Sequence, residues 1–435
     1  MPLIVSSSGI RGTVEGRAGE NLTPLDVVSW VGAWGIWIRR HHRGSVSLVV
    51  GQDARPSGAL FRPLAIHTLR ALGYEIHDIG LTTTPTLAMV IPHLAAQGGL
   101  ILTASHNPSG WNALKFLDAA GEFLPPTAIE EIDALRKELE FSSTDHPGSV
   151  HLYEGALTYH LSTLVSHPWV CTHRIRQAQL RIVVDTINSS GGVFVPALLE
   201  SLGVSEIRVL NGEPNGRFAH PPEPLPENLQ DLAREVQASR AHVGIAVDPD
   251  VDRVAFYLPD GSPFGEEYTL VAVTDYILSH EKGPVVANQS TTAAVAWIAN
   301  RYGVPFYESR VGEYYVVQKM KAVGAVIGGE GNGGIIWPRL HYGRDALVGI
   351  ALFLSHLAEA GGDPVALRAR YPRYVLLKAK MSLSSPPPSD FWRRLADVAA
   401  DAEISLEDGL KLRWAEKWIH LRASATEPLL RLIAE

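Results

Sequence analysis

The sequence predicts an α/β protein in which three similar α/β domains, with mixed or parallel sheets, and a smaller C-terminal α+β domain surround one central cleft. Short β-rich runs alternate with helical patterns over 46–140, 181–247 and 284–360. Such alternation is typical of sheets covered by helices on both faces. In each of the three segments, a loop of unusual composition follows one strand. Because ligands of open α/β sheets bind at the carboxyl ends of strands, we expect the three loops to share one cleft.

Apolar runs and helical periodicity place the individual elements. We expect helices over 27–38, 59–72 and 128–140, and strands over 46–50, 99–102, 181–185, 207–210, 241–247, 284–287 and 325–328. Polar or Gly/Pro-rich segments at 142–148, 259–263 and 361–364 indicate breaks between domains. The expected domains are therefore 1–148, 149–260, 261–368 and 369–435.

Composition narrows the class of partner and the compartment. The chain has 435 residues and a net charge of −8, with no basic tract, which argues against nucleic-acid or membrane partners. A single cysteine, Cys171, excludes an internal disulfide and fits a reducing compartment. The N-terminus lacks the pattern of a signal peptide, and the apolar stretch 27–38 is too short to span a bilayer. We expect a cytoplasmic monomer or homodimer.

Three aspartates, Asp248, Asp250 and Asp252, directly follow the strand expected over 241–247. Three carboxylates on a tight loop repel one another, so a hard divalent cation such as Mg²⁺ is their natural ligand. An EF-hand is excluded because Arg and Pro stand where that loop needs Gly and Glu. A solvated turn remains an equal alternative on spacing alone. The position at a strand end favours the metal, and Arg253 beside it favours a phosphate.

Ser105, in the loop after the strand over 99–102, is the candidate nucleophile. Most loop serines form turns or caps. A hydrolase with His106 as base is a weak alternative, since adjacent side chains seldom face each other and no Gly-x-Ser-x-Gly elbow is present. A phosphoserine at this position is favoured, because its dianion would complete the coordination sphere that the three aspartates leave open.

The glycine-rich loop 329–334 matches the Gly-x-Gly-x-x-Gly pattern of dinucleotide-binding proteins, so an oxidoreductase is an alternative. The helical pattern resumes only near Arg344, however, which would leave the pyrophosphate without a helix N-terminus. A flexible loop that presents Glu330 and Asn332 to vicinal sugar hydroxyls is favoured instead.

The C-terminal segment 422–431 combines basic and hydroxyl side chains: Arg422, Ser424, Thr426 and Arg431. Arginine donors, hydroxyls and backbone N–H groups together suit a phosphate cradle. The start of an amphipathic helix explains part of the same pattern equally well.

Taken together, these motifs resemble those of the α-D-phosphohexomutases, which interconvert the 1- and 6-phosphates of hexoses. The matching segments are Ser8–Gly12, Thr103–Pro108, Asp248–Arg253, Gly329–Gly334 and Arg422–Arg431. They occur in the family's order and span nearly the whole chain. Weaker agreement extends to Gly51–Ser57 and to the region 311–320.

The resemblance implies a mechanism and assigns roles. Ser105 would be a phosphoserine that exchanges phosphoryl groups with a hexose phosphate substrate, through a hexose 1,6-bisphosphate that also serves as activator. Mg²⁺ would be held by the three aspartates and the phosphoserine. Arg11 and Lys115 would assist proton movement, and Arg253 would support the phosphoserine and the metal loop. The C-terminal domain would be a moving clamp on the substrate.

The resemblance also assigns the substrate-binding residues. Glu330 and Asn332 would bind the sugar's O3 and O4, and Arg310 would lie where many relatives have a lysine near the sugar. The phosphate that is not reacting would be held by Arg422, Ser424, Thr426 and Arg431.

One departure from the family pattern concerns the sugar loop. Many relatives end it with Ser-Gly-His, whereas this chain has Asn332 and ends with Gly334. His341 is a candidate replacement for the missing imidazole, and a surface or core histidine is an equal alternative. This form of the loop resembles a subgroup often assigned to phosphoglucosamine mutases. We therefore expect phosphoglucosamine mutase activity, with phosphoglucomutase or phosphomannomutase as the runner-up and an inactive sugar-phosphate binder as an alternative from another class.

Overall fold

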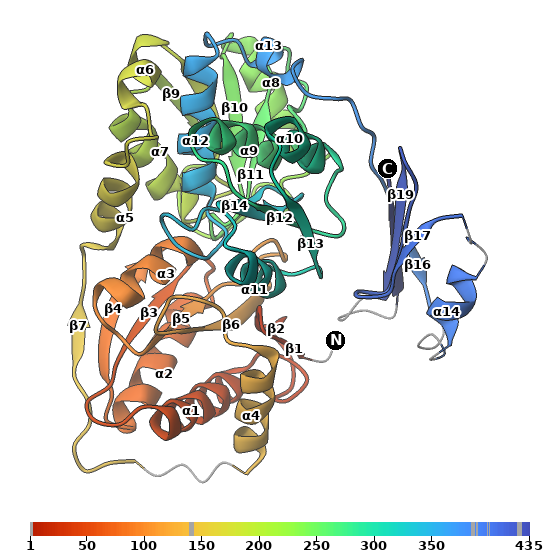
Figure 1. The fold of residues 1–435 in the computed structure, drawn as a ribbon. Helices are drawn as coiled ribbons and strands as arrows, with labels where there is room; N and C mark the ends of the chain where they lie inside the picture. The colour runs from red at the N-terminus through yellow and green to blue at the C-terminus, as the bar shows by residue number, and fades with distance from the viewer. Residues whose placement is uncertain are drawn as a thin grey trace.

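The computed structural model describes residues 3–138, 143–383, 388, 390–397, 399, 401–423 and 429–435. These residues form four successive units, each built on its own sheet. In Figure 1 the first unit lies below, the second and third lie together above it, and the C-terminal unit lies to the side. The predicted architecture of three α/β domains and a smaller C-terminal domain is confirmed.

The first unit is a mixed sheet in the order β1-β2-β6-β5-β3-β4-β7. Its strands are β1 (Ile4–Ser6), β2 (Gly9–Thr13), β3 (Ser47–Gln52), β4 (Glu75–Leu81), β5 (Gly98–Leu102), β6 (Trp111–Asp118) and β7 (Val150–Leu152), and its helices are α1 (Pro24–His41), α2 (Gly58–Ala71), α3 (Thr84–His93) and α4 (Pro126–Lys137). Helix α1 starts where the Asp26 carboxylate accepts the backbone N–H of Thr23 at 3.0 Å, which satisfies a donor that a helix start leaves free. It buries Trp30 and Trp34 in the core.

The second and third units have sheets in the orders β11-β10-β8-β9 and β13-β12-β14-β15. The second contains α5 (Ala156–Val165), α6 (Thr172–Gln177), β8 (Arg181–Asp185), α7 (Gly191–Leu202), β9 (Glu206–Leu210), α8 (Gln230–Ala238), β10 (Val243–Val247) and β11 (Val254–Tyr257). The third contains α9 (Tyr268–His280), β12 (Val285–Asn288), α10 (Ala294–Tyr302), β13 (Phe306–Ser309), α11 (Glu313–Val323), β14 (Ile327–Glu330), β15 (Gly334–Ile336), α12 (Ala346–Glu359) and α13 (Pro364–Arg368).

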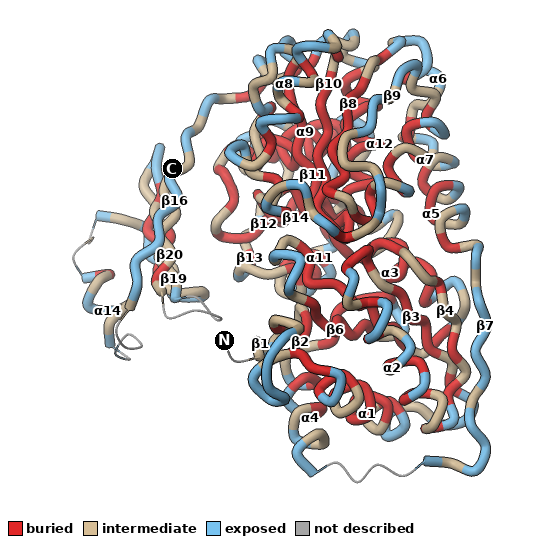
Figure 2. The backbone as a smooth tube through the Cα atoms, turned by 180° about the vertical axis from the view of Figure 1, so that it is seen from behind, coloured by how far each residue is buried: buried red, intermediate tan, exposed pale blue. Residues whose placement is uncertain are grey.

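One apolar cluster runs through the second and third units. Helix α12 is buried on nearly all sides, and Phe353 on it stacks on Phe256 of β11 with ring centroids 3.8 Å apart. Figure 2 shows this burial as a continuous red interior. Because close-packed apolar surfaces resist sliding, the two units are expected to behave as one body.

The C-terminal unit has an antiparallel sheet in the order β16-β20-β19-β18-β17. Its elements are β16 (Leu377–Ser382), α14 (Phe391–Ala396), β17 (Glu403–Ser405), β18 (Leu410–Arg413), β19 (Trp418–Ala423) and β20 (Leu429–Ala434). It has a small apolar cluster of its own, which includes Ala396, Leu410 and Leu412. None of the helices in the described part of the chain has both the length and the apolar character needed to cross a bilayer.

The structure refines the sequence prediction in the three sheets that carry the predicted loops. Each loop joins a strand to an antiparallel neighbour rather than to a helix: β5 to β6, β10 to β11, and β14 to β15. The strand expected over 325–328 begins at Ile327 and runs through Glu330, so Gly329 and Glu330 belong to it. Strand β7, just past the expected boundary at 148, pairs with β4 of the first sheet. The domain boundaries otherwise remain a prediction.

Candidate active site

The loop that carries Ser105 is held from behind by one buried arginine. The Arg55 guanidinium donates to the backbone carbonyls of Ser105 and Asn107, both at 2.6 Å, and to that of Trp111 at 2.9 Å. Asp53 accepts from Arg55 Nε at 3.1 Å and from Thr103 Oγ1 at 2.6 Å. Ser105 itself has a left-handed backbone, φ +49°, which costs energy for a residue with a side chain. These contacts fix its hydroxyl in one place.

The Ser105 hydroxyl points at the metal loop of the second unit. Its Oγ donates to Asp248 Oδ2 at 2.7 Å, across 143 positions of sequence. His106 Nδ1 lies 3.4 Å from the same Oγ, at the long end of a hydrogen bond. The charge of Arg253, with burial, holds the pKa of His106 well below its usual value. His106 therefore favours its neutral form and stands beside Ser105, the candidate nucleophile.

The three aspartates converge as predicted. One carboxylate oxygen from each of Asp248, Asp250 and Asp252 lies within 4.8 Å of the others, and all three residues are fully buried. Burial and the neighbouring carboxylates raise the pKa of Asp248 well above its usual value. Burial acts the same way on Asp250, but Lys115 outweighs it and lowers the pKa.

Two carboxylate oxygens of this cluster accept no hydrogen bond. Asp250 Oδ2 accepts from Lys115 Nζ and Thr84 Oγ1, each at 2.6 Å, while its Oδ1 accepts from nothing. Asp252 Oδ2 accepts from Arg344, and its Oδ1 has no hydrogen bond either. Buried acceptors without donors are rare in proteins. An all-oxygen, anionic donor set of this kind fits a hard divalent cation such as Mg²⁺.

Cationic side chains surround the cluster. Arg11 donates to Asn107 Oδ1 at 3.0 Å and to the carbonyl of Ser8 at 3.1 Å. Burial, helped by the charges of Arg253 and Arg344, lowers the pKa of Arg11 to about 10 against the opposing effect of the aspartates. Arg253 Nε lies 3.7 Å from Asp252 Oδ1, too far for a hydrogen bond. The cluster can therefore receive a phosphoryl group between anionic and cationic walls.

The sugar-loop residue Glu330 is buried and bound on both oxygens. Its Oε1 accepts from Asn288 Nδ2 at 2.8 Å and from the N–H of Gly312 at 3.1 Å, and its Oε2 accepts from Arg344 Nη1 at 2.6 Å. Burial alone would raise the pKa of Glu330, but the charge of Arg344 lowers it. Asn332 is half-buried at the turn, where its Oδ1 accepts the N–H of Gly334 at 3.3 Å.

His341 contacts a helix cap. Its Nε2 lies 3.0 Å from Asp345 Oδ2, and His160 Nε2 lies 3.0 Å from the same oxygen. Asp345 Oδ1 in turn accepts two backbone N–H groups at the start of α12. The geometry thus gives His341 a supporting place beside α12, and its part in binding a sugar stays a prediction.

The predicted phosphate cradle is described in part. Arg422 on β19 and Arg431 on β20 are directly paired in the sheet register, which puts both side chains on the same face of the sheet. Burial lowers the pKa of Arg422. Ser424 and Thr426 lie outside the described residues. Arg310 is exposed, with its guanidinium carbon 4.4 Å from the ring centre of Tyr315.

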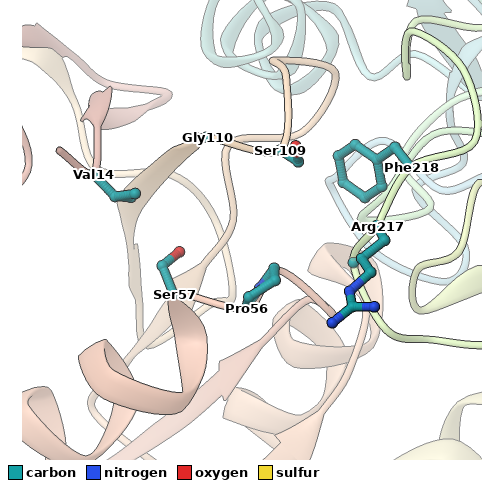
Figure 3. Close-up of a pocket in the computed structure, with 8 residues that line it drawn as sticks. Val14, Pro56, Ser57, Ser109, Gly110, Arg217 and Phe218 are labelled. Atoms are coloured by element: carbon teal, nitrogen blue, oxygen red, sulfur yellow. The ribbon is translucent and has the colours of Figure 1, made fainter.

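A cavity of about 390 Å³ lies between the first and second units, beside the Ser105 loop (Figure 3). It is lined by Val14, Pro56, Ser57, Ser109, Gly110, Gly216, Arg217 and Phe218. The Phe218 ring, from the second unit, lies 4.9 Å from the guanidinium carbon of Arg55. The cavity therefore borders the residues that hold the nucleophile loop, and the aspartate cluster is not among its walls.

Two residues of this site were not singled out by sequence reasoning. Arg344 contacts both the metal loop and the sugar loop, and Arg55 holds the nucleophile loop. Both belong to segments that were noticed, around 340–345 and 51–57. The signal that could have found them is an arginine one or two positions from an aspartate, in a Gly-containing segment at the end of a regular element.

Comparison with known proteins defines the class of this site. Models of the phosphoglucomutase/phosphomannomutase α/β/α domains I, II and III match residues 3–143, 160–261 and 265–374. The chain belongs to this family, within the α-D-phosphohexomutase superfamily, as its motifs indicated.

Individual relatives are similar to this chain over most of their own length. The "Probable phosphoglucosamine mutase" of Methanopyrus kandleri is 33% identical, with 99% of this chain and 93% of the relative covered. The "Phosphoglucomutase/phosphomannomutase" of Thermococcus kodakarensis is 31% identical, covering 97% and 93%. A crystal structure of a phosphoglucomutase/phosphomannomutase family protein from Burkholderia thailandensis superposes with a TM-score of 0.82 at 26% identity, covering 99% and 93%.

Proposed function

We propose that the protein interconverts glucosamine 6-phosphate and glucosamine 1-phosphate, with Ser105 as the phosphoryl carrier and Asp248, Asp250 and Asp252 as ligands of Mg²⁺. The observation that carries this proposal is the contact of Ser105 Oγ with Asp248 Oδ2 at 2.7 Å, next to two buried carboxylate oxygens that accept no hydrogen bond. A nucleophile and an anionic oxygen cluster that meet in this way suit phosphoryl transfer. The name of the Methanopyrus relative supports glucosamine as the sugar.

The chain's own residues account for most of the chemistry. Mg²⁺, when bound, would neutralise charge on the transferring phosphoryl group. Arg11 and Lys115 stand on the Ser105 side of the cluster and can hold developing negative charge there. Ser105 is only 2% exposed, so water has little access to its phosphate ester.

Turnover requires two transfers. In the first, the bond between phosphorus and Ser105 Oγ breaks as a bond from phosphorus to a sugar oxygen forms, and the proton of that sugar hydroxyl passes to a base. The resulting hexose 1,6-bisphosphate must turn over, so that its other phosphate faces Ser105. The reverse transfer then restores the phosphoserine. Arg422 and Arg431, which pair across β19 and β20, would hold whichever phosphate is not reacting.

A second candidate is phosphoglucomutase or phosphomannomutase activity at the same site, which the Thermococcus relative's name supports. A dinucleotide oxidoreductase is disfavoured by the geometry. The loop 331–333 is the turn of the β14–β15 hairpin, and the next helix, α12, starts only at Ala346. A Cβ at Gly333, φ +85°, would lie 2.3 Å from the carbonyl oxygen of Val254, so this glycine serves close packing.

³¹P NMR tests the proposal directly. The protein is incubated with Mg²⁺, a trace of glucose 1,6-bisphosphate and, separately, the 6-phosphates of glucosamine, glucose and mannose. We expect a new 1-phosphate resonance, formed fastest with glucosamine 6-phosphate. A faster reaction with glucose or mannose 6-phosphate would select the second candidate. No product with any of the three, from protein in which Ser105 cannot be phosphorylated, would support an inactive sugar-phosphate binder.

A further inference from the structure

Arg344 is the one guanidinium, among the described residues, that pairs with both the metal loop and the sugar loop. Its Nη2 lies 2.6 Å from Asp252 Oδ2, and its Nη1 lies 2.6 Å from Glu330 Oε2. Its Nε lies 3.1 Å from Glu313 Oε2, and its backbone N–H donates to Glu313 Oε1 at 3.0 Å. The residue is 8% exposed. One buried cation therefore ties together carboxylates from the β10–β11 loop, β14 and α11.

Gly334 makes room for this arrangement. A Cβ at Gly334 would lie 2.3 Å from Arg344 Cδ, closer than real atoms approach. The backbone of Gly334 is not left-handed, so what the position needs is space rather than conformational freedom. Arg344 Cδ cannot simply swing aside, because the guanidinium beyond it is fixed by its carboxylate partners. The chain thus uses the absence of a side chain in the sugar loop to admit an arginine.

The two ends of this bridge have opposite consequences for binding. At the metal loop, Asp252 keeps Oδ1 without a hydrogen bond while Oδ2 is held by Arg344. The positive charge of Arg344, held 2.6 Å from Asp252 Oδ2, repels a divalent cation bound by the aspartates. At the sugar loop, the same charge holds Glu330 in one orientation and keeps it ionised, ready to accept from hydroxyls.

We propose that Arg344 is a positioning residue that links the two loops: it orients Glu330 for sugar binding and, as a fixed cation, limits how tightly the aspartates bind their metal. This inference rests on the proposed function, since it presumes that the aspartates hold a metal and that Glu330 contacts the sugar.

The decisive variant is Arg344→Gln, which removes the charge and keeps a hydrogen-bonding side chain. Binding of Mn²⁺, measured by electron paramagnetic resonance without sugar, is expected to tighten by roughly tenfold or more, because a nearby cation is gone. The KM for glucosamine 6-phosphate is expected to rise by roughly tenfold or more, with a smaller change in kcat. Simple structural damage would weaken both. Weakening of both, or no change in either, would overturn the inference.

Arg344→Lys separates charge from geometry. Lysine keeps the positive charge but lacks the planar fork that meets two carboxylates at once. Mn²⁺ affinity should return to the wild-type value, while KM stays raised. A lysine variant that binds Mn²⁺ as tightly as the glutamine variant would contradict the role of the charge.

Gly334→Ala tests the same bridge from the other side, and it leaves every buried charge of the bridge in place. We expect KM to rise by about fivefold or more in the wild-type background and not to rise further in Arg344→Gln, because the two changes act on one contact. Additive effects would count against the bridge. Arg339→Gln is the matched control: this arginine is exposed, pairs with Glu281 at 2.7 Å on the surface, and should leave both measurements unchanged.

The wild-type protein separates failure of this inference from failure of the proposed function. Wild type that binds no Mn²⁺ and turns over none of the three hexose phosphates would overturn both. Wild type that does both, together with unchanged values in Arg344→Gln, would overturn only the link.

Discussion

The buried centre, where the first three units meet, differs in kind from the junction that carries the C-terminal unit. In the centre, Ser105, the aspartates and Arg344 are closed on one another with little exposure, and one apolar cluster continues through the second and third units behind them. The C-terminal unit keeps its apolar cluster to itself. Figure 1 shows its sheet beside the third unit, joined to it by the single connecting segment between α13 and β16.

The contacts across the junction are polar. Val311 N–H donates to Asp408 Oδ2 at 2.9 Å, Ser290 Oγ lies 2.8 Å from His420 Nδ1, and Lys411 Nζ donates to the carbonyl of Gln289 at 2.6 Å. The Glu435 carboxylate accepts the N–H of Ala293 at 2.8 Å. Water can replace such contacts at small net cost, whereas a packed apolar interface cannot be opened cheaply. We therefore expect the reacting groups to stay fixed and the C-terminal unit, which carries Arg422 and Arg431, to be the part that moves.

The largest expected effect lies in the centre. Ser105→Ala removes the phosphoryl carrier and should lower mutase turnover by roughly 10⁴-fold or more, because no other group can take its part. A coupled assay of 1-phosphate formation measures this, with Ser109→Ala in the same loop as control. Retained full activity would remove the phosphoserine mechanism.

Asp250→Asn, also in the centre, should have the second-largest effect on activity. It removes one of the three aspartate charges, at a carboxylate that also pairs with Lys115, so the Mg²⁺ concentration needed for half-maximal activity should rise by about 10- to 100-fold. Direct titration with Mn²⁺ supplies a second readout. An unchanged metal response would place the metal elsewhere.

In the C-terminal unit, Arg422→Gln should act mainly on substrate binding. Loss of one charge-assisted hydrogen bond to phosphate is worth roughly 1.5–3 kcal/mol, which corresponds to about a 10- to 150-fold rise in KM. Steady-state kinetics, which give kcat and KM separately, measure this effect. If kcat fell instead and KM held, the cradle would belong to the fixed centre, and the contrast between the two regions would fail.

Phe218→Ala should have a smaller effect on the centre. The ring covers Arg55, and a cation–π contact of roughly 0.5–2 kcal/mol predicts a two- to thirtyfold loss in kcat, with Phe218→Trp restoring it. Trp297→Ala serves as control, because this exposed tryptophan on α10 forms the same kind of contact with a different arginine, Arg301, at 5.9 Å from its guanidinium carbon. Equal losses in both variants would show that only stability had changed.

The smallest expected effect on turnover is at Glu267, which lies beside the junction, 3.7 Å from Lys378 of β16. Burial raises the pKa of its carboxyl from 4.5 to about 8. The folded state therefore binds more protons than the unfolded state between these values, and stability falls as pH rises from about 4.5 to about 8. Glu267→Gln should remove this loss, by up to a few kcal/mol at pH 8. Thermal unfolding at pH 5 and pH 8 compares the two proteins, and an equal pH dependence would contradict the account.

The sequence could predict what is encoded locally. The aspartate cluster could be predicted from the sequence because an apolar run, 241–247, ends directly before Asp248. The antiparallel partner strands could not be predicted in the same way. Strand β15, Gly334–Ile336, for example, is too short and too apolar to show the alternation of polar and apolar residues that marks a strand. Arg344 could not be placed, because its partners lie 14, 31 and 92 positions away and only the tertiary fold brings them together. The same holds for Phe218 on Arg55, which depends on how two units dock.

The most direct test of the central claim follows the phosphoryl group itself. The protein is first incubated with glucose 1,6-bisphosphate, and mass spectrometry of the intact chain and of its peptides locates the phosphate. Glucosamine 6-phosphate is then added in excess with Mg²⁺. We predict one phosphoryl group on Ser105 that leaves within a single turnover and appears in a glucosamine bisphosphate. A phosphate that is found on another residue, or that stays on Ser105 after the sugar is added, would contradict the account.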